Sequence, residues 1–71
     1  MSVEELKIRL FREEIPHYCY CIGGDEEQRI CLMQSGSGWI VYYSEDGERI
    51  DLAEHSSEQA ACEDLYRRVA Q

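Results

Sequence analysis

The fold is decided by a continuous run of strand-forming residues that ends in a turn: GWIVYYSEDGE, residues 38–48. Every residue from Trp39 to Tyr43 is β-branched or aromatic, and such side chains favour a β-strand. The Asp46-Gly47 pair that follows is typical of a tight hairpin turn. The segment therefore predicts a central strand, with a short return strand over Arg49–Leu52.

Two more strands are expected on the N-terminal side of this segment. The first is His17–Ile22, which is rich in Tyr and Cys, and the second is Arg29–Gln34. A glycine pair and three acidic residues separate the two, and Ser35–Gly38 forms the next turn. Four consecutive strands joined by short turns predict an up-and-down meander.

A helix is expected at each end of the chain. Ser2 and Glu5 have the spacing of a capping box, and Pro16 predicts that this first helix ends near Glu13 or Glu14. Ser56 with Gln59 gives a second capping box, followed by apolar residues at helical spacing: Ala61, Cys62, Leu65 and Val69. The sequence predicts one α+β domain over residues 1–71, a four-stranded antiparallel β-meander flanked by an N-terminal and a C-terminal helix.

The turns set a register in which three pairs keep the faces consistent: Cys21 with Cys31, Leu32 with Val41, and Tyr43 with Ile50. One face is then the expected core, covered by one or both helices: Tyr18, Tyr20, Ile22, Ile30, Leu32, Trp39, Val41, Tyr43, Ile50 and Leu52. The other face carries Cys19, Cys21, Cys31, Met33, Ile40 and Tyr42.

A solvated sheet face is normally polar, whereas the centre of this second face is apolar. Either the first helix crosses it or another protein contacts it. In the second case Met33, Ile40 and Tyr42 would supply the apolar contact, and the face could also form a homodimer. Among the tyrosines, Tyr18 and Tyr42 are the candidates for partial exposure.

Two acidic turns are the main candidate for a binding site. Asp25, Glu26 and Glu27 lie between the first two strands, and Glu45, Asp46 and Glu48 lie between the last two. In a meander these turns share one end of the sheet, where only Arg29 and Arg49 lie close by. Concentrated negative charge attracts cationic surfaces and accelerates their encounter.

The overall charge agrees with a basic partner. Fifteen Asp and Glu residues against seven Lys and Arg give a net charge of −8 at pH 7, which disfavours nucleic acid and anionic membranes as partners. The alternative is that this charge only keeps a small domain soluble. The N-terminus has no basic region followed by an apolar core, and no apolar run approaches about 20 residues, so we expect a cytoplasmic protein.

No residue pattern indicates catalysis, and no cofactor or metal is expected. Cys19, Cys21 and Cys31 could bind a soft metal or form a disulfide, but ordinary half-buried thiols are the simplest interpretation. His17 and His55 are expected to be exposed residues at element boundaries. The glycine pairs lie in hairpin turns rather than at a strand-to-helix junction, so they do not indicate a phosphate-binding loop.

The segment 38–48, followed by SEQAACEDL at residues 57–65, resembles small bacterial immunity-like proteins of polymorphic toxin and contact-dependent inhibition systems. In these, a similar hairpin precedes a helix with an A-C-x-x-L core. The resemblance covers residues 38–65. It implies a protein that neutralises a cognate toxin by direct binding, often by covering a basic active site.

Overall fold

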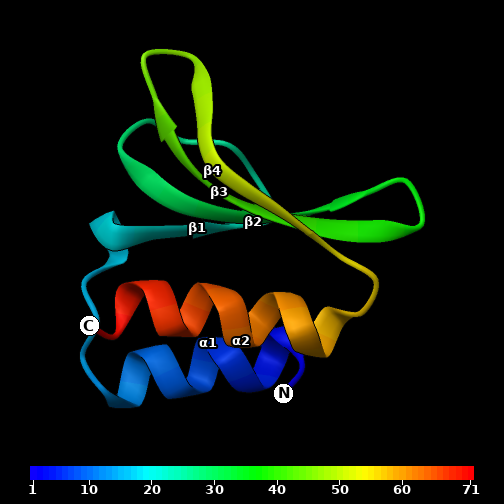
Figure 1. Cartoon of the computed structure of the whole chain (residues 1–71). Coiled ribbons are helices and arrows are strands. Elements are labelled where there is room, and N and C mark those ends of the chain that lie inside the picture. Colours follow the sequence, from blue (N-terminus) through cyan, green and yellow to red (C-terminus); the bar gives the residue numbers. More distant parts are fainter.

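The computed structural model describes all 71 residues, Met1–Gln71, as two helices and a four-stranded sheet (Figure 1). The elements in chain order are α1 (Val3–Arg12), a 3₁₀ turn η1 (His17–Cys19), β1 (Tyr20–Ile22), β2 (Arg29–Ser35), β3 (Gly38–Glu45), β4 (Glu48–His55) and α2 (Glu58–Val69). The α+β class and the order of helices and strands are as expected from the sequence. No helix has the length and apolar character needed to cross a membrane.

Both helices begin at a serine cap. Ser2 accepts a hydrogen bond from the backbone N–H of Glu5, and the Glu5 side chain accepts one from the Ser2 N–H, which completes the expected capping box. The second cap lies one residue later than expected, because Ser57 and not Ser56 accepts from the Ala60 N–H, at 3.1 Å. Each cap satisfies a backbone donor that the first helical turn leaves free.

The sheet has the strand order β1-β2-β3-β4, and the last three strands are antiparallel neighbours. The first pair differs from the predicted meander, because β1 and β2 run parallel. The parallel arrangement needs only the short connection Gly23–Gln28 because β1 has just three residues. This connection, teal in Figure 1, runs back over the sheet on the side away from the helices.

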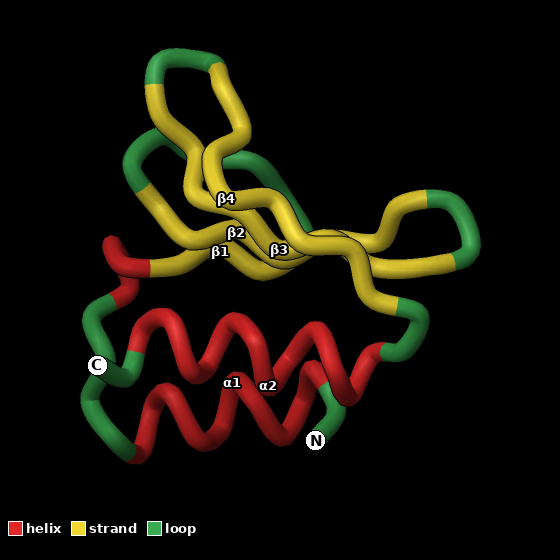
Figure 2. The backbone as a smooth tube through the Cα atoms, in the orientation of Figure 1, coloured by secondary structure: helices red, strands yellow, loops and turns green.

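The expected antiparallel register is confirmed for Leu32 opposite Val41 and for Tyr43 opposite Ile50. Cys21 also lies opposite Cys31, but in a parallel pair, so the antiparallel register expected for the first two strands is wrong. The Asp46-Gly47 turn closes β3 and β4 with positive φ at both residues, which a two-residue hairpin of the favoured twist requires. In Figure 2 the β2–β3 turn extends past the ends of the helices, whereas the β3–β4 turn rises from the other end of the sheet, away from the helices.

Both helices lie on one side of the sheet (Figures 1 and 2). Seven buried residues form the main core between these layers: Leu6, Leu10, Leu32, Val41, Ala61, Cys62 and Leu65. Tyr20, Ile22, Ile30 and Trp39 pack against this core, as the sequence indicated. α1 packs mainly against α2, whose other side contacts β2, β3 and β4.

The predicted core face includes residues near both of its ends that the structure shows to be exposed. Tyr18 is 71% exposed because His17–Cys19 form a 3₁₀ turn instead of the start of a strand. Ile50 and Leu52 are also exposed, although β4 extends to His55 and is longer than expected. A β-bulge places Asp51 and Leu52 opposite the single residue Tyr42, with Asp51 at φ +54°, and it turns this part of β4 away from the helices.

Candidate functional site

The two acidic segments meet at the end of the sheet where β2 begins and β3 ends. Arg29 pairs with Ser44 there, and Glu45 pairs with Glu48 across the β3–β4 turn. We call this surface the acidic end, and it consists of Asp25, Glu26, Glu27, Glu45, Asp46 and Glu48. The sequence placed these residues together through an antiparallel first hairpin. The structure brings them together by another route, since the connection after the parallel strand β1 returns to the start of β2.

Three hydrogen bonds hold the Gly23–Gln28 connection against the β3–β4 hairpin. The Ser44 hydroxyl donates to Asp25 at 3.1 Å, and the Gln28 N–H donates to the Ser44 carbonyl at 2.7 Å. The Asp46 N–H donates to the Glu27 carboxylate. The acidic end is therefore a defined surface made by two loops, in which the carboxylates of one loop accept from the other.

The negative charge of this surface is only partly neutralised within the chain. Glu26 forms the one ion pair there, with Arg29 at 3.3 Å. The Arg49 guanidinium instead lies over the Tyr42 ring, 4.8 Å from its centroid, in cation–π geometry. Five of the six acidic residues are exposed and Glu45 is half-buried. Such an arrangement favours the approach of Lys and Arg side chains.

The sheet face opposite the helices holds a second small core of Cys31, Ile40 and Tyr42, with Cys21 and Met33 packed against it. Tyr42 has no exposed surface and Ile40 is 5% exposed, so their predicted role as exposed contact residues is wrong. Neither helix covers this face. The Gly23–Gln28 connection lies against it instead, as the 3.6 Å contact from the Cys31 thiol to the Glu26 carbonyl shows. Met33 remains half-buried.

Burial shapes the chemistry of this second core. Burial, and next the neighbouring Asp25 carboxylate, raise the pKa of Tyr42 to about 12. Burial, followed by the hydrogen bond to Glu26, raises the pKa of the Cys21 thiol to about 11. Both changes disfavour the charged form, so neither side chain is activated as a nucleophile.

All four cysteines are free thiols in the structure. No group of three His, Cys, Asp or Glu side chains is arranged to hold a metal ion.

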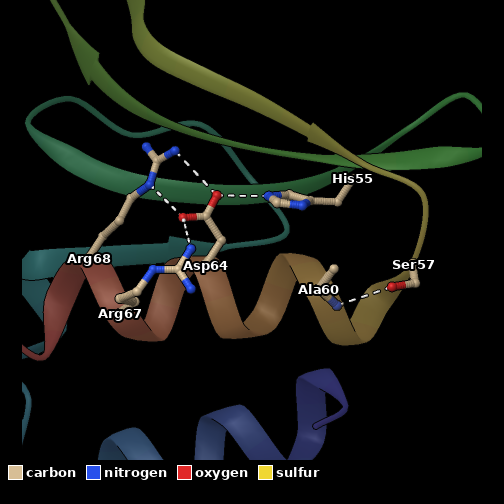
Figure 3. A network of polar contacts seen from close by, with 6 residues as sticks. All are labelled: His55, Ser57, Ala60, Asp64, Arg67 and Arg68. Carbon is tan, nitrogen blue, oxygen red and sulfur yellow. Dashed lines mark hydrogen bonds and ion pairs between the residues drawn. The ribbon is translucent and has the colours of Figure 1, made fainter.

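A polar cluster between β4 and α2 was not predicted. Asp64 on α2 is 5% exposed, and its carboxylate binds His55 Nε2 at 2.8 Å and Arg68 Nε at 2.9 Å (Figure 3). Arg67, which is mostly exposed, reaches the same carboxylate at 3.5 Å. Burial alone would raise the pKa of Asp64, but the hydrogen bonds from Arg68 and His55 together outweigh it and lower the pKa.

This cluster corrects the expectation for His55, which is half-buried and paired instead of free at an element boundary. The i, i+4 spacing of Asp64 and Arg68 was a visible signal for an ion pair on α2. The contribution of His55 was hidden, because β4 was expected to stop at Leu52. The cluster ties the end of the sheet to α2 and lies on a different part of the molecule from the acidic end.

No protein-family model, curated protein or solved structure matches this chain.

Proposed function

We propose that this chain is a non-catalytic protein-binding module that recognises a basic protein through its acidic end. The observation that carries the proposal is that two separate loops bring six carboxylates together, with only two guanidinium groups nearby to balance their charge. The specific form of the proposal is an immunity protein that neutralises a cationic toxin, as the resemblance of residues 38–65 implies. In that case the carboxylates pair with basic residues around the active site of the toxin.

The physical argument concerns both rate and specificity. Exposed carboxylates on one small surface raise the local concentration of a cationic partner and orient it before contact. Pairs that become desolvated at the interface then add to the affinity, whereas those at the rim act mainly on the association rate. The hydrogen bonds between the two loops fix the position of Asp25 and Glu27 in advance, so little conformational entropy is lost on binding.

The test is affinity capture from the native host with three tagged baits. The first is the wild-type chain, and the second neutralises the acidic end with Glu26→Gln, Glu27→Gln, Glu45→Gln and Asp46→Asn. The third is a charge-matched control that neutralises four exposed carboxylates elsewhere, with Glu4→Gln, Glu14→Gln, Glu54→Gln and Glu63→Gln. All three should retain the wild-type circular dichroism spectrum.

We expect one basic protein to bind the wild type and the control, and to be lost from the acidic-end variant. If that protein is a toxic enzyme, one equivalent of the chain should abolish its activity. Equal capture by all three baits would show that the acidic end does not recognise the partner. Capture of only the chain itself would favour the alternative of a self-associating domain without a toxin partner.

A further inference from the structure

The outer face of α1 carries the most exposed large apolar side chains of the two helices. Phe11 is 76% exposed and Ile8 is 52% exposed, whereas Leu6 and Leu10 on the opposite side of the same helix are fully buried. Ile8 and Phe11 are three positions apart and therefore neighbours on the helix surface. α1 packs mainly against α2, and its outer side is left without a partner in the fold (Figure 1).

We propose that this outer face binds the same face of a second copy of the chain, with the two α1 helices antiparallel. The proposed interface consists of Glu5, Ile8, Phe11 and Arg12, and we call it the α1 face. It does not overlap the acidic end, so the proposal stands independently of the proposed function. The expectation of a dimer through the second sheet face is replaced, because Tyr42 and Ile40 on that face are buried within the chain.

The order of charges along α1 specifies the antiparallel direction. Glu5 lies near the start of the helix and Arg12 at its end, on the two sides of Ile8 along the chain. In an antiparallel pair Ile8 of each copy lies against Phe11 of the other, and Glu5 of each lies beside Arg12 of the other. A parallel pair would instead hold Glu5 level with Glu5 and Arg12 level with Arg12, so that neither carboxylate lies level with a guanidinium group. Arg12 takes part in none of the ion pairs within the chain and is free for this contact.

Charge also explains why a second copy fits here and not elsewhere. The chain carries −8 at pH 7, so most of its surface repels another copy. α1 is the exception, because Lys7, Arg9 and Arg12 are three of the seven cationic residues and balance the acidic residues of its first turn. The same helix thus combines the exposed apolar pair with the least local repulsion.

The size of the interface sets the expected affinity. A helix of ten residues covers much less than the roughly 800 Å² per partner of a standard stable interface. We therefore expect a weak dimer, with a dissociation constant on the order of 100 µM. Such a dimer forms at high local concentration and leaves both acidic ends accessible.

The experiment is sedimentation equilibrium of the untagged chain from roughly 20 µM to 1 mM at moderate salt, a range chosen to bracket the expected affinity. We expect the weight-average mass to rise from monomer towards dimer over this range. Phe11→Ser should remain monomeric throughout. Arg12→Glu should weaken the dimer by about tenfold, because it replaces two attractive contacts with two repulsive ones. Arg67→Glu, a charge-matched change at an exposed arginine of α2, should leave it unchanged.

The decisive variant is the double charge reversal Glu5→Lys with Arg12→Glu, which should restore the dimer to within about threefold of wild type. Glu5→Lys removes part of the helix cap, so circular dichroism must confirm that α1 stays folded. A weaker cap cannot restore association, and restoration would therefore report the predicted pairing. A wild-type chain that stays monomeric at 1 mM overturns the proposal. So does a dimer that Phe11→Ser leaves intact, or an Arg12→Glu defect that the double reversal fails to repair.

Discussion

The polar cluster around Asp64 gives the sharpest prediction for stability. Asp64→Asn keeps the shape of the side chain and removes its charge, so no cavity is created. The wild-type carboxylate accepts from His55 at 2.8 Å and from two Arg68 nitrogens at 2.9 and 3.3 Å, with all three side chains mostly buried. Hydrogen bonds to a charged group are worth about 1.5–3 kcal/mol when shielded from water. The 3.5 Å contact to the exposed Arg67 adds little.

We therefore expect Asp64→Asn to lower the free energy of unfolding by about 2 kcal/mol, since the asparagine retains a carbonyl acceptor for one partner. The full stability of a domain of this length is only about 4–10 kcal/mol. Urea unfolding followed by Trp39 fluorescence should show the loss. With a denaturant slope of about 1 kcal/mol/M, the midpoint should fall by roughly 2 M.

Two further variants make this prediction refutable. Glu63→Gln changes the exposed neighbour of Asp64 on the same helix and should stay within about 0.5 kcal/mol of wild type. His55→Gln combined with Asp64→Asn should cost less than the sum of the single changes, because the two residues share one contact. An Asp64→Asn protein as stable as the Glu63→Gln control would show that the cluster does not hold β4 to α2.

The remaining predictions concern pH, packing and thiol chemistry. Because the pKa of Asp64 is lowered in the folded state, the Asp64 carboxylate stabilises the fold above its ordinary pKa near 3.8, and this stabilisation is lost as the pH falls through the folded-state pKa. The stability of Asp64→Asn should therefore depend less on pH in acid unfolding than that of the wild type. Gly38→Ala should destabilise the chain by about 1–3 kcal/mol in urea unfolding, because its Cβ would lie 2.8 Å from the His55 carbonyl oxygen; an effect below that of Glu63→Gln would contradict this. In native protein at pH 8, a disulfide reagent should label Cys19 before the other three cysteines. Cys31 and Cys62 are buried, and the raised pKa of Cys21 keeps its thiol protonated. Rapid labelling of Cys62, seen by mass spectrometry, would show that Cys62 is not buried in the core.

Local sequence signals predicted most of the fold. Serine caps, a run of β-branched and aromatic residues, and the Asp46-Gly47 turn each act over a few residues, and each produced the expected element. The cross-strand register followed because a slip of one residue would move Leu32 and Val41 from the core to the other face. These constraints are contained in the chain segment itself, so no tertiary information was needed.

The errors arose where tertiary contacts decide the outcome. The Gly23–Gln28 connection can turn tightly into a hairpin or return along the sheet, and its composition does not distinguish the two paths. The second path shields Tyr42 and Cys31, which is why the exposed apolar face expected from alternation does not exist. The bulge at Asp51 likewise depends on the packing of β4 beside Tyr42, and it exposes Ile50 and Leu52.

The sequence predicted which residues form the candidate site better than it predicted the contacts around them. The two acidic segments needed only to be recognised as loops at one end of the sheet, and their hydrogen bonds to each other follow from that proximity. The Asp64 cluster required His55 to reach α2 from a strand longer than the sequence suggested. Long-range polar contacts of this kind have no periodic pattern in the sequence.

The most direct test of the central claim is an NMR titration of the ¹⁵N-labelled chain with a lysine octapeptide at low salt, repeated with the acidic-end variant and the charge-matched control. The peptide stands in for the cationic surface of a partner. We predict amide shift changes concentrated at residues 25–28 and 45–48, preserved in the control and abolished in the acidic-end variant. Shift changes spread evenly over the exposed carboxylates of both helices, and reduced equally in the two variants, would contradict the claim that the acidic end is a cation-recognition surface.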